Sequence, residues 1–392
     1  MSAAGEGTST ADITGPITPS PTPVLPNDDD ECEPGLYPVS YVAEFEGAGE
    51  WPFAGDRKRI VIGGSRRRED RQRHDIAIPE RGLSGTHCLL ERRANSIRVY
   101  DLGSTNGTYV GGTKIETSWD VRIGDKFSPR PLTLFLMDDV MQAHRGTLFE
   151  ILGTGFPPSP DMLLTEVVRQ ASPVIIVGDE GCGQELLAQA IHDMSPRRNH
   201  PMITIADIPA DRAAQSALVR QASKPKTTAV LQIKAKKGTP PLDPQFVSSL
   251  YSPSYGVRVI AVATTEEDVE HALPRQQIHQ SYHISLRPLA FRAGEIEQLL
   301  DRLLAARGSP DLRTADLLPE NQEALRTYGW PKNLTQLHKV ADAIVAHEKH
   351  GGVRPASRAL GVSPSTLHEQ LERVGLVVRN VPGSERKSLF RS

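Results

Sequence analysis

Hydrophobic and polar positions change their spacing along the chain. Between residues 37 and 139, apolar and polar residues alternate in short runs such as RIVIGG and SIRVYDL, which Gly, Asn and Asp separate. Such runs predict short strands joined by tight turns, as in a sandwich or barrel. From 147 to 289, helical patterns alternate with apolar runs such as PVIIV and VRVIAVA. This second pattern predicts a parallel sheet covered by helices.

Only helical patterns remain between residues 292 and 379. GEIEQLLDRLLAARG predicts an amphipathic helix that ends at Gly308, and NLTQLHKVADAIVAHEKHGG predicts another that ends at Gly351 and Gly352. The first 36 residues show no such period, because Pro, Thr, Ser and acidic residues dominate them. That composition buries too little apolar surface to offset the entropy of ordering, so it predicts a disordered tail.

Composition narrows the function classes. The 392 residues carry a net charge of −3, which is not the footprint of a nucleic-acid coat, so any DNA contact must be local. Cys32, Cys88 and Cys182 are too few and too scattered for a disulfide framework or a zinc cluster, and we expect no metal. No apolar run approaches the roughly 20 residues of a membrane span. The sequence therefore predicts a cytoplasmic protein with no membrane partner.

Four elements of the first module belong together: IVIGGS from Ile60, GLSGTH ending at His87, DLGSTNGTYVGG from Asp101 and RIGDKF from Arg122. This set resembles a forkhead-associated (FHA) domain, a β-sandwich that binds phosphothreonine peptides on loops at one end. Turns rich in hydroxyl, amide and backbone N–H donors suit a phosphate dianion. The resemblance implies that phosphate and peptide are bound by the loop residues Ser84, Thr105 and Asn106, with His87 and Gly107 as architectural residues.

The module departs from the FHA pattern at two positions. The family usually has Arg where this chain has Gly64, and a basic residue where it has Gly85. A run of arginines follows, and Arg66 is our candidate for a replacement phosphate contact, although a solvated loop explains the run equally well. Without the upstream residues, Asn106-Gly107 would be interpreted as a hairpin turn.

A glycine-rich loop lies between a predicted strand and a predicted helix in the second module. GDEGCGQELLAQAIH has the outline of a Walker A loop, G-x-x-x-x-G-K, with Gln184 at the lysine position. The order of segments over residues 147–348 resembles the AAA+ domain of NtrC-type sigma-54 activators. The resemblance implies three losses, since Gln184 replaces the Walker A lysine, Gln232-Ile233 the Walker B Asp-Glu pair, and Thr335 the sensor arginine.

These losses remove the chemistry of ATP hydrolysis. A neutral amide cannot replace the lysine charge, and Gln232 offers neither a hard anionic ligand nor a base. The stretch 208–228 is also too short for the GAFTGA loop that contacts the sigma factor. We predict a pseudo-ATPase with no catalytic residue and no cofactor, and leave nucleotide binding without hydrolysis open. Alternatively, the loop GDEGCG, which begins at Gly178, is a tight strand-to-helix turn in which Gly181 and Gly183 serve only geometry.

The last module has the spacing of a helix-turn-helix. In VRPASRALGVSPSTLHEQLERVGL, Gly361 marks the turn, and Ser363 caps a helix with Pro364 at its first position. It resembles the Fis-type DNA-binding end of the same activators. Two glutamates on the reading helix oppose phosphate contact, so a helical hairpin used for dimerisation is the alternative. The candidate DNA contacts are Arg354, Arg358, Ser365, Thr366, His368 and Arg373.

The expected fold is therefore multidomain. It consists of a disordered tail (1–36), an all-β FHA sandwich (37–140), a degenerate AAA+ α/β domain (147–290), a helical lid (291–350), a helix-turn-helix (351–379) and a basic tail (380–392).

The predicted function is that of a bacterial transcriptional regulator without ATPase activity. It would bind phosphothreonine proteins through the FHA domain and DNA through the helix-turn-helix. The alternative is a phosphothreonine-dependent adaptor in a Ser/Thr-kinase pathway, partnered with a kinase or an active enhancer-binding activator, that does not bind DNA. Homo-oligomerisation stays open. If a kinase phosphorylates Thr14, Thr18 or Thr22, the tail could dock on Ser84 and Asn106 of its own or a neighbouring chain. An unmodified linker is the alternative that we favour.

Overall fold

The computed structural model describes residues 39–390, except 48, 54, 66–74, 94–95, 155–156, 171, 207, 210, 224–225, 234–241 and 381–386. The predicted disordered tail and the candidate phosphate contact Arg66 therefore lie outside the described residues. Among the described residues, no helix is both long enough and apolar enough to cross a membrane.

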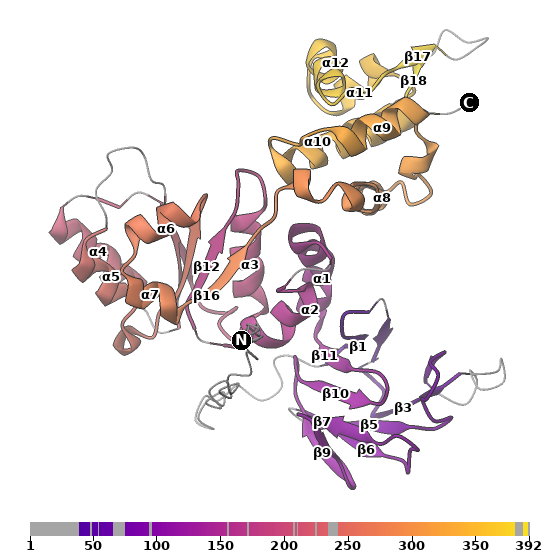
Figure 1. Cartoon of the computed structure of the whole chain (residues 1–392), viewed down its shortest axis with the longest axis vertical. Coiled ribbons are helices and arrows are strands. Elements are labelled where there is room, and N and C mark those ends of the chain that lie inside the picture. The colour runs from indigo at the N-terminus through magenta and orange to yellow at the C-terminus, as the bar shows by residue number, and fades with distance from the viewer. Residues whose placement is uncertain are drawn as a thin grey trace, which may run out of the picture. The chain divides into compact units, whose positions relative to one another are not determined.

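The first module contains two β-sheets (Figure 1). One sheet has the order β2 (Glu50–Pro52), β1 (Tyr41–Glu44), β11 (Leu134–Met137), β10 (Lys126–Pro129), β7 (Thr108–Val110) and β8 (Thr113–Lys114). The other has the order β4 (Ile76–Ile78), β3 (Arg59–Gly64), β5 (Cys88–Arg92), β6 (Ile97–Asp101) and β9 (Ser118–Val121). Neighbouring strands pair antiparallel except β3 and β4, which are parallel.

The two sheets share one hydrophobic core, as strand alternation requires. Ile60 and Ile62 point inward from β3, and Val99 points inward from β6. They pack in one cluster with Phe127 of β10 and Leu136 of β11 in the other sheet. Successive side chains of a strand face opposite sides, so every second residue reaches this core. The predicted β-sandwich is confirmed.

The second module is a parallel sheet with helices. Its strand order is β13 (Met202–Ile205), β14 (Thr228–Gln232), β15 (Arg258–Ala263), β12 (Val174–Val177) and β16 (Tyr282–Ser285), all parallel. The helices are α1 (Asp139–Leu152), α2 (Pro160–Met162) with a π-helix (Leu163–Val167), α3 (Gln184–Met194), α4 (Arg212–Ala222), α5 (Pro244–Leu250), a 3₁₀ turn (Pro253–Tyr255), α6 (Glu266–Ala272) and α7 (Arg275–Gln280).

Both faces of this sheet are buried. Val174 and Ile176 of β12 belong to a core that also contains residues of α1 and α3, whereas Ile175 and Val177 belong to a second core with residues of α4, α5 and α6. A sheet buried on both faces needs continuous apolar strands, and this explains the unbroken run PVIIV. The predicted parallel α/β fold is confirmed.

The third module is helical. After 3₁₀ turns at Leu289–Phe291 and Ala293–Glu295 come α8 (Ile296–Ala306), a 3₁₀ turn (Thr314–Asp316), α9 (Pro319–Thr327), α10 (Asn333–His350), α11 (Val353–Ala359) and α12 (Pro364–Arg373). Gly308 and Gly351 adopt positive φ values of 78° and 70° just after α8 and α10, the left-handed region that glycine tolerates. Both predicted helix ends are therefore confirmed.

The C-terminal segment packs back against α9. Strand β17 (Arg379–Asn380) begins at the last residue of the expected helix-turn-helix and pairs with β18 (Lys387–Ser388) in the region expected as a basic tail. The Asn321 side chain, which is fully buried, accepts a hydrogen bond from Val377 N at 2.7 Å and donates to Val377 O and Leu389 O. Leu389 is also fully buried. One buried amide thus fixes both the segment after α12 and the end of the chain to the lid.

Candidate functional site

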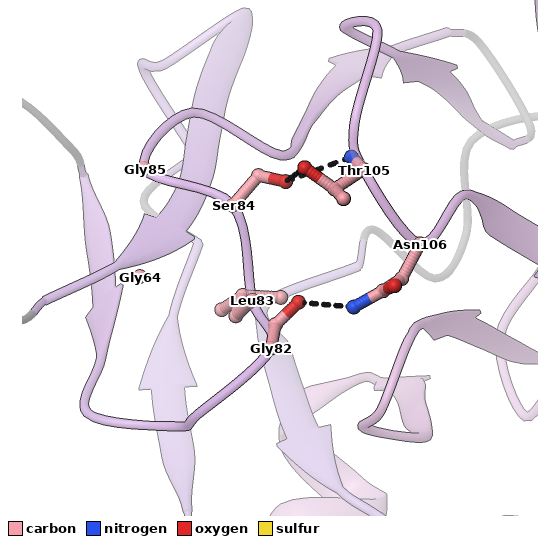
Figure 2. Close-up of a pocket in the computed structure, with 7 residues that line it drawn as sticks. All are labelled: Gly64, Gly82, Leu83, Ser84, Gly85, Thr105 and Asn106. Atoms are coloured by element: carbon pink, nitrogen blue, oxygen red, sulfur yellow. Dashed lines mark hydrogen bonds between the residues drawn. The ribbon is translucent and has the colours of Figure 1, made fainter.

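Two loops at one end of the sandwich form a small cavity of about 400 Å³ (Figure 2). One loop joins β4 to β5 and carries Ser84, and the other joins β6 to β7 and carries Thr105 and Asn106. The cavity is lined by Gly64, Gly82, Leu83, Ser84, Gly85, Thr105 and Asn106. The structure therefore brings together the three residues that the sequence proposed for phosphopeptide contact.

Ser84 and Thr105 point toward one another across the cavity (Figure 2). The backbone N–H of Thr105 donates to Ser84 Oγ at 3.0 Å, and the two hydroxyl oxygens lie 3.4 Å apart. The two hydroxyl groups therefore converge on one place, where the Thr105 N–H holds Ser84 Oγ, and the described residues that line the cavity include no acidic one. Such a set offers fixed hydrogen-bond donors to an anion.

Asn106 is held in a defined orientation. Its Nδ2 donates to Gly82 O at 2.7 Å, from one loop to the other (Figure 2). This bond fixes which end of the side-chain amide is nitrogen, and leaves Oδ1 and the second N–H as the groups able to meet a peptide backbone. Gly107 follows with a φ of 75°, which a side chain would disfavour.

His87 ties the two loops together from inside the sandwich. The ring is fully buried; Nδ1 accepts from Ser84 N at 3.2 Å, and Nε2 lies 3.3 Å from Gly107 O. Burial lowers the pKa of His87, so the neutral ring is favoured, with Nε2–H donating to the carbonyl. The ring contacts the backbone of each loop and lies outside the cavity lining. This geometry agrees with the architectural role expected for His87.

The two departures from the FHA pattern differ in their surroundings. A Cβ atom on Gly64 would lie 2.6 Å from Leu83 O, whereas one on Gly85 would meet nothing within 4 Å. Gly64 N also donates to Ser84 O at 2.8 Å. The Ser84 loop thus lies so close to β3 that only glycine fits at position 64.

The glycine-rich turn of the second module keeps a loop geometry without the lysine. Gly181 and Gly183 have φ values of 82° and 98°, and Gly183 is the N-cap of α3. The Gln184 amide nitrogen donates to Gly178 O and, at 3.0 Å, to Asp179 O. The side chain therefore folds back on the carbonyls of its own loop.

Gln232 and Glu185 occupy the two positions that bind the metal ion in a Walker site. Gln232 Nε2, at the end of β14, donates to Glu185 Oε1 at 2.6 Å. In the Walker A pattern, the position of Glu185 belongs to the Ser or Thr whose hydroxyl binds Mg²⁺. Sequence analysis did not single out Glu185, although its place directly after Gln184 would have identified it.

The start of α10 contacts the same turn. The Asn333 side chain accepts from Leu289 N at 2.8 Å and donates to Glu180 O at 3.0 Å. Thr335 N donates to Gly181 O at 3.4 Å. A Cβ on Gly181 would lie 2.3 Å from Lys332 O and 3.1 Å from Thr335 Oγ1. The predicted residues of the turn and Thr335 therefore do lie together, in contact through the backbone.

The candidate DNA contacts lie on exposed surfaces of α11 and α12. Ser363 Oγ accepts from Thr366 N at 3.0 Å, which confirms the predicted helix cap. On α12, Arg373 pairs with Glu369 at 2.6 Å, and His368 lies 3.3 Å from Glu372. On α11, Arg354 and Arg358 are exposed and four residues apart, and so on one face of the helix.

Two family models match parts of the chain. Residues 60–128 match the FHA domain, and residues 161–219 match the sigma-54 interaction domain. The first match contains the cavity residues from Gly64 to Asn106, and the second contains the glycine-rich turn.

Similar curated proteins are bacterial regulators. The response regulator protein FleR of Pseudomonas aeruginosa is 26% identical over 232 residues, which cover 50% of this chain and 49% of FleR. The Nif-specific regulatory protein of Azotobacter vinelandii is 25% identical, over 55% of this chain and 48% of that protein. A sigma L-dependent transcriptional regulator of Bacillus subtilis, YplP, described as putative, is 28% identical over 47% and 56%. The chain spans about half the length of these relatives.

Solved structures with local likeness fall into the same two groups. The FHA domain of CT664 from Chlamydia trachomatis is 23% identical and covers 25% of this chain and 95% of that one, with a TM-score of 0.22. NtrX from Brucella abortus in complex with ATP is 16% identical and covers 60% and 72%, with a TM-score of 0.36. The family-model matches confirm two parts of the resemblance seen in the sequence: an FHA domain over residues 60–128 and, over residues 161–219, a sigma-54 interaction domain, and the similar curated proteins are bacterial regulators.

Proposed function

We propose that this chain is a transcription regulator that binds phosphothreonine proteins through the cavity between the Ser84 and Thr105 loops. The observation that carries the proposal is the convergence of the Ser84 and Thr105 hydroxyls and the oriented Asn106 amide on one cavity, with the Thr105 N–H fixing Ser84 Oγ in place. These groups suit the phosphate and the adjoining peptide backbone, and the FHA match over residues 60–128 supports the same ligand.

Phosphopeptide binding is tested by calorimetry with the full chain. The probes are peptides of one sequence with phosphothreonine, phosphoserine or threonine at the centre. We expect the threonine peptide to bind at least about ten-fold more weakly than the phosphothreonine peptide, because hydrogen bonds to charged groups are the strong ones. Ser84→Ala should remove most of that difference, and Ser118→Ala on β9, outside the cavity lining, is the matched control. Equal affinity for all three peptides would reject the proposal.

The second module acts, in this proposal, without ATP hydrolysis. The position of the Walker A lysine, which binds the phosphates, holds the neutral amide of Gln184, and this amide donates to the loop carbonyls. The two metal-binding positions hold Gln232 and Glu185, and the Glu185 carboxylate accepts a hydrogen bond from Gln232. A carboxylate at position 185 also repels the phosphates. Measurable ATP turnover by the purified chain, abolished by Gly183→Asp, would overturn this part.

The helical end contacts DNA in the leading version of the proposal. Exposed Arg354 and Arg358 lie on one face of α11, where they can neutralise phosphates. We expect specific retention of genomic fragments against excess competitor DNA at moderate salt, and its loss when Arg354, Arg358 and Arg373 become Ala.

An adaptor without DNA binding is the second candidate. One observation favours it: α12 carries two exposed glutamates, Glu369, which pairs with Arg373, and Glu372, which lies beside His368. No retention of any fragment, together with intact phosphopeptide binding, would identify the adaptor and turn the search to protein partners.

A further inference from the structure

The cavity between the two FHA loops has an uncharged lining. Its seven residues are three glycines, one leucine, and three residues with hydroxyl or amide groups, none of them charged. A phosphopeptide nevertheless brings a phosphate of about −1.5 to −2 charges. Cations beside the cavity are therefore suited to meet this charge and that of acidic side chains next to the phosphothreonine.

We propose that Lys114 and Arg130 form a cationic rim beside Asn106 that selects phosphothreonine peptides with an acidic side chain close to the phosphothreonine. The inference rests on the proposed phosphopeptide binding and specifies its ligand class. It assigns specificity to two residues that the sequence pattern did not single out.

Lys114 lies over the Asn106-Gly107 turn. It is the last residue of β8 and pairs across the strand with Tyr109 of β7. A Cβ on Gly107 would lie 2.6 Å from Lys114 Cε and 3.3 Å from Nζ. The missing side chain of Gly107 thus leaves room for the lysine stem and places the ammonium beside the residue that orients the peptide backbone.

Arg130 approaches the same turn from the other side of β7. Its backbone N–H donates to Gly107 O at 3.2 Å, and its guanidinium lies 3.9 Å above the ring of Tyr109. Stacking on an aromatic face limits the rotamers of the arginine, so less freedom is lost when it binds a carboxylate. Tyr109 is therefore flanked by both cations of the rim.

Both rim side chains are exposed, and neither forms an ion pair with an acidic residue in the described part of the chain. Most other arginines of the two sheets are already paired, for example Arg98 with Asp120 at 2.7 Å and Arg59 with Glu91. The rim thus combines proximity to Asn106 with available charge. Because the rim is exposed, solvent screens its ion pairs with acidic peptide side chains, and this limits the gain in affinity.

The test measures the affinity of the full chain for a series of phosphothreonine peptides. Each peptide is neutral except for the phosphothreonine and one Glu, moved from four residues before it to four after it. We expect Glu to tighten binding about three- to ten-fold at one or two adjacent positions, and this gain should shrink as salt rises.

Charge reversal at the rim supplies the decisive variant. With Lys114→Glu and Arg130→Glu together, the ratio of affinities for the Glu peptide and the neutral phosphopeptide should fall below one, and a Lys peptide should become the preferred ligand. Arg122→Glu is the matched control and should keep the wild-type ratio. Arg122 is exposed and precedes β10, whereas Arg130 follows that strand. Ratios are compared because the reversal also weakens phosphate binding in general.

The outcomes separate the two levels of the argument. Phosphothreonine binding with no preference for Glu at any position, or a preference that survives the reversal, overturns the rim and leaves phosphopeptide binding standing. No binding of any phosphopeptide overturns both. If binding of the double variant is lost altogether, Lys114→Gln and Arg130→Gln must still abolish the preference for Glu while retaining binding of the neutral phosphopeptide.

Discussion

Gln232 donates a hydrogen bond to Glu185 at 2.6 Å, across 47 positions of the sequence. The first residue ends β14 and the second lies in the first turn of α3, directly after the glycine-rich loop. In a Walker site these two places are bridged through Mg²⁺. Here an amide and a carboxylate contact each other directly, so the two elements are joined by the protein's own side chains.

Nucleotide should therefore leave the thermal stability unchanged. A ligand present at a hundred times its Kd stabilises by about 2.7 kcal/mol, which raises Tm by several degrees in a domain of this size. We expect no shift of Tm with millimolar ATP and Mg²⁺, measured by differential scanning fluorimetry. The variant Gln184→Lys with Glu185→Thr and Gln232→Asp is the positive comparison. A Tm rise in the wild-type chain with millimolar ATP and Mg²⁺ would contradict the prediction.

Restoring the two basic residues of the FHA pattern should have opposite results. Gly85→Arg enters open space and should strengthen phosphopeptide binding several-fold, because it adds a charge-assisted donor beside Ser84. Gly64→Arg must push Leu83 O away from its Cβ, so it should lower the stability of the sandwich and weaken binding. Calorimetry and thermal unfolding of both variants decide this. Improved binding by Gly64→Arg would show that the loop yields easily.

Packing of the C-terminal segment should protect the helix-turn-helix. Leu389→Ala removes a fully buried side chain and should cost about 2–5 kcal/mol of local stability. We expect faster amide hydrogen exchange in α9, α11 and α12, measured by mass spectrometry on the full chain. Val377→Ala is the matched control, since that side chain is 46% exposed and its backbone bonds to Asn321 remain. Unchanged exchange in Leu389→Ala would mean that α11 and α12 do not depend on the segment.

Acid should destabilise the helical module through His347. The ring is 2% exposed on α10, lies beside Phe390, and neither ring nitrogen has a hydrogen-bond partner in the described structure. Burial lowers the pKa of His347 below its value of about 6.5 in the unfolded chain. The unfolded state therefore binds more protons below about pH 6.5, and stability falls as the pH decreases from there.

The measurement is the unfolding midpoint in urea between pH 8 and pH 5. We expect His347→Leu to reduce the decrease of this midpoint with falling pH. Part of the decrease should remain, because burial also lowers the pKa of His87 and of His192. A profile identical to that of the wild-type chain would show that His347 is not responsible.

Much of the fold follows from local patterns. Strand alternation around Ile60 and Ile62, the apolar run from Val174 to Val177, and the Ser363-Pro364 cap each depend on neighbours within a few residues. The spacing of apolar residues reflects which face of an element is buried, and a capping residue supplies an acceptor for the free N–H groups at a helix start. Both can be recognised in the sequence. The FHA motifs also identified Ser84, Thr105 and Asn106, which the structure brings to one cavity.

The sequence by itself determined the order of modules, the type of most helices and strands, and three residues of the cavity, Ser84, Thr105 and Asn106, because these depend on short-range patterns and motifs. Only the tertiary structure decided that Gly64 must be glycine beneath Leu83, that Glu185 meets Gln232, that Asn333 joins Leu289 to the glycine-rich turn, and that Asn321 fixes the end of the chain. Each of these contacts links residues 19 to 153 positions apart. No local period encodes such distances, since packing of whole elements decides which side chains meet.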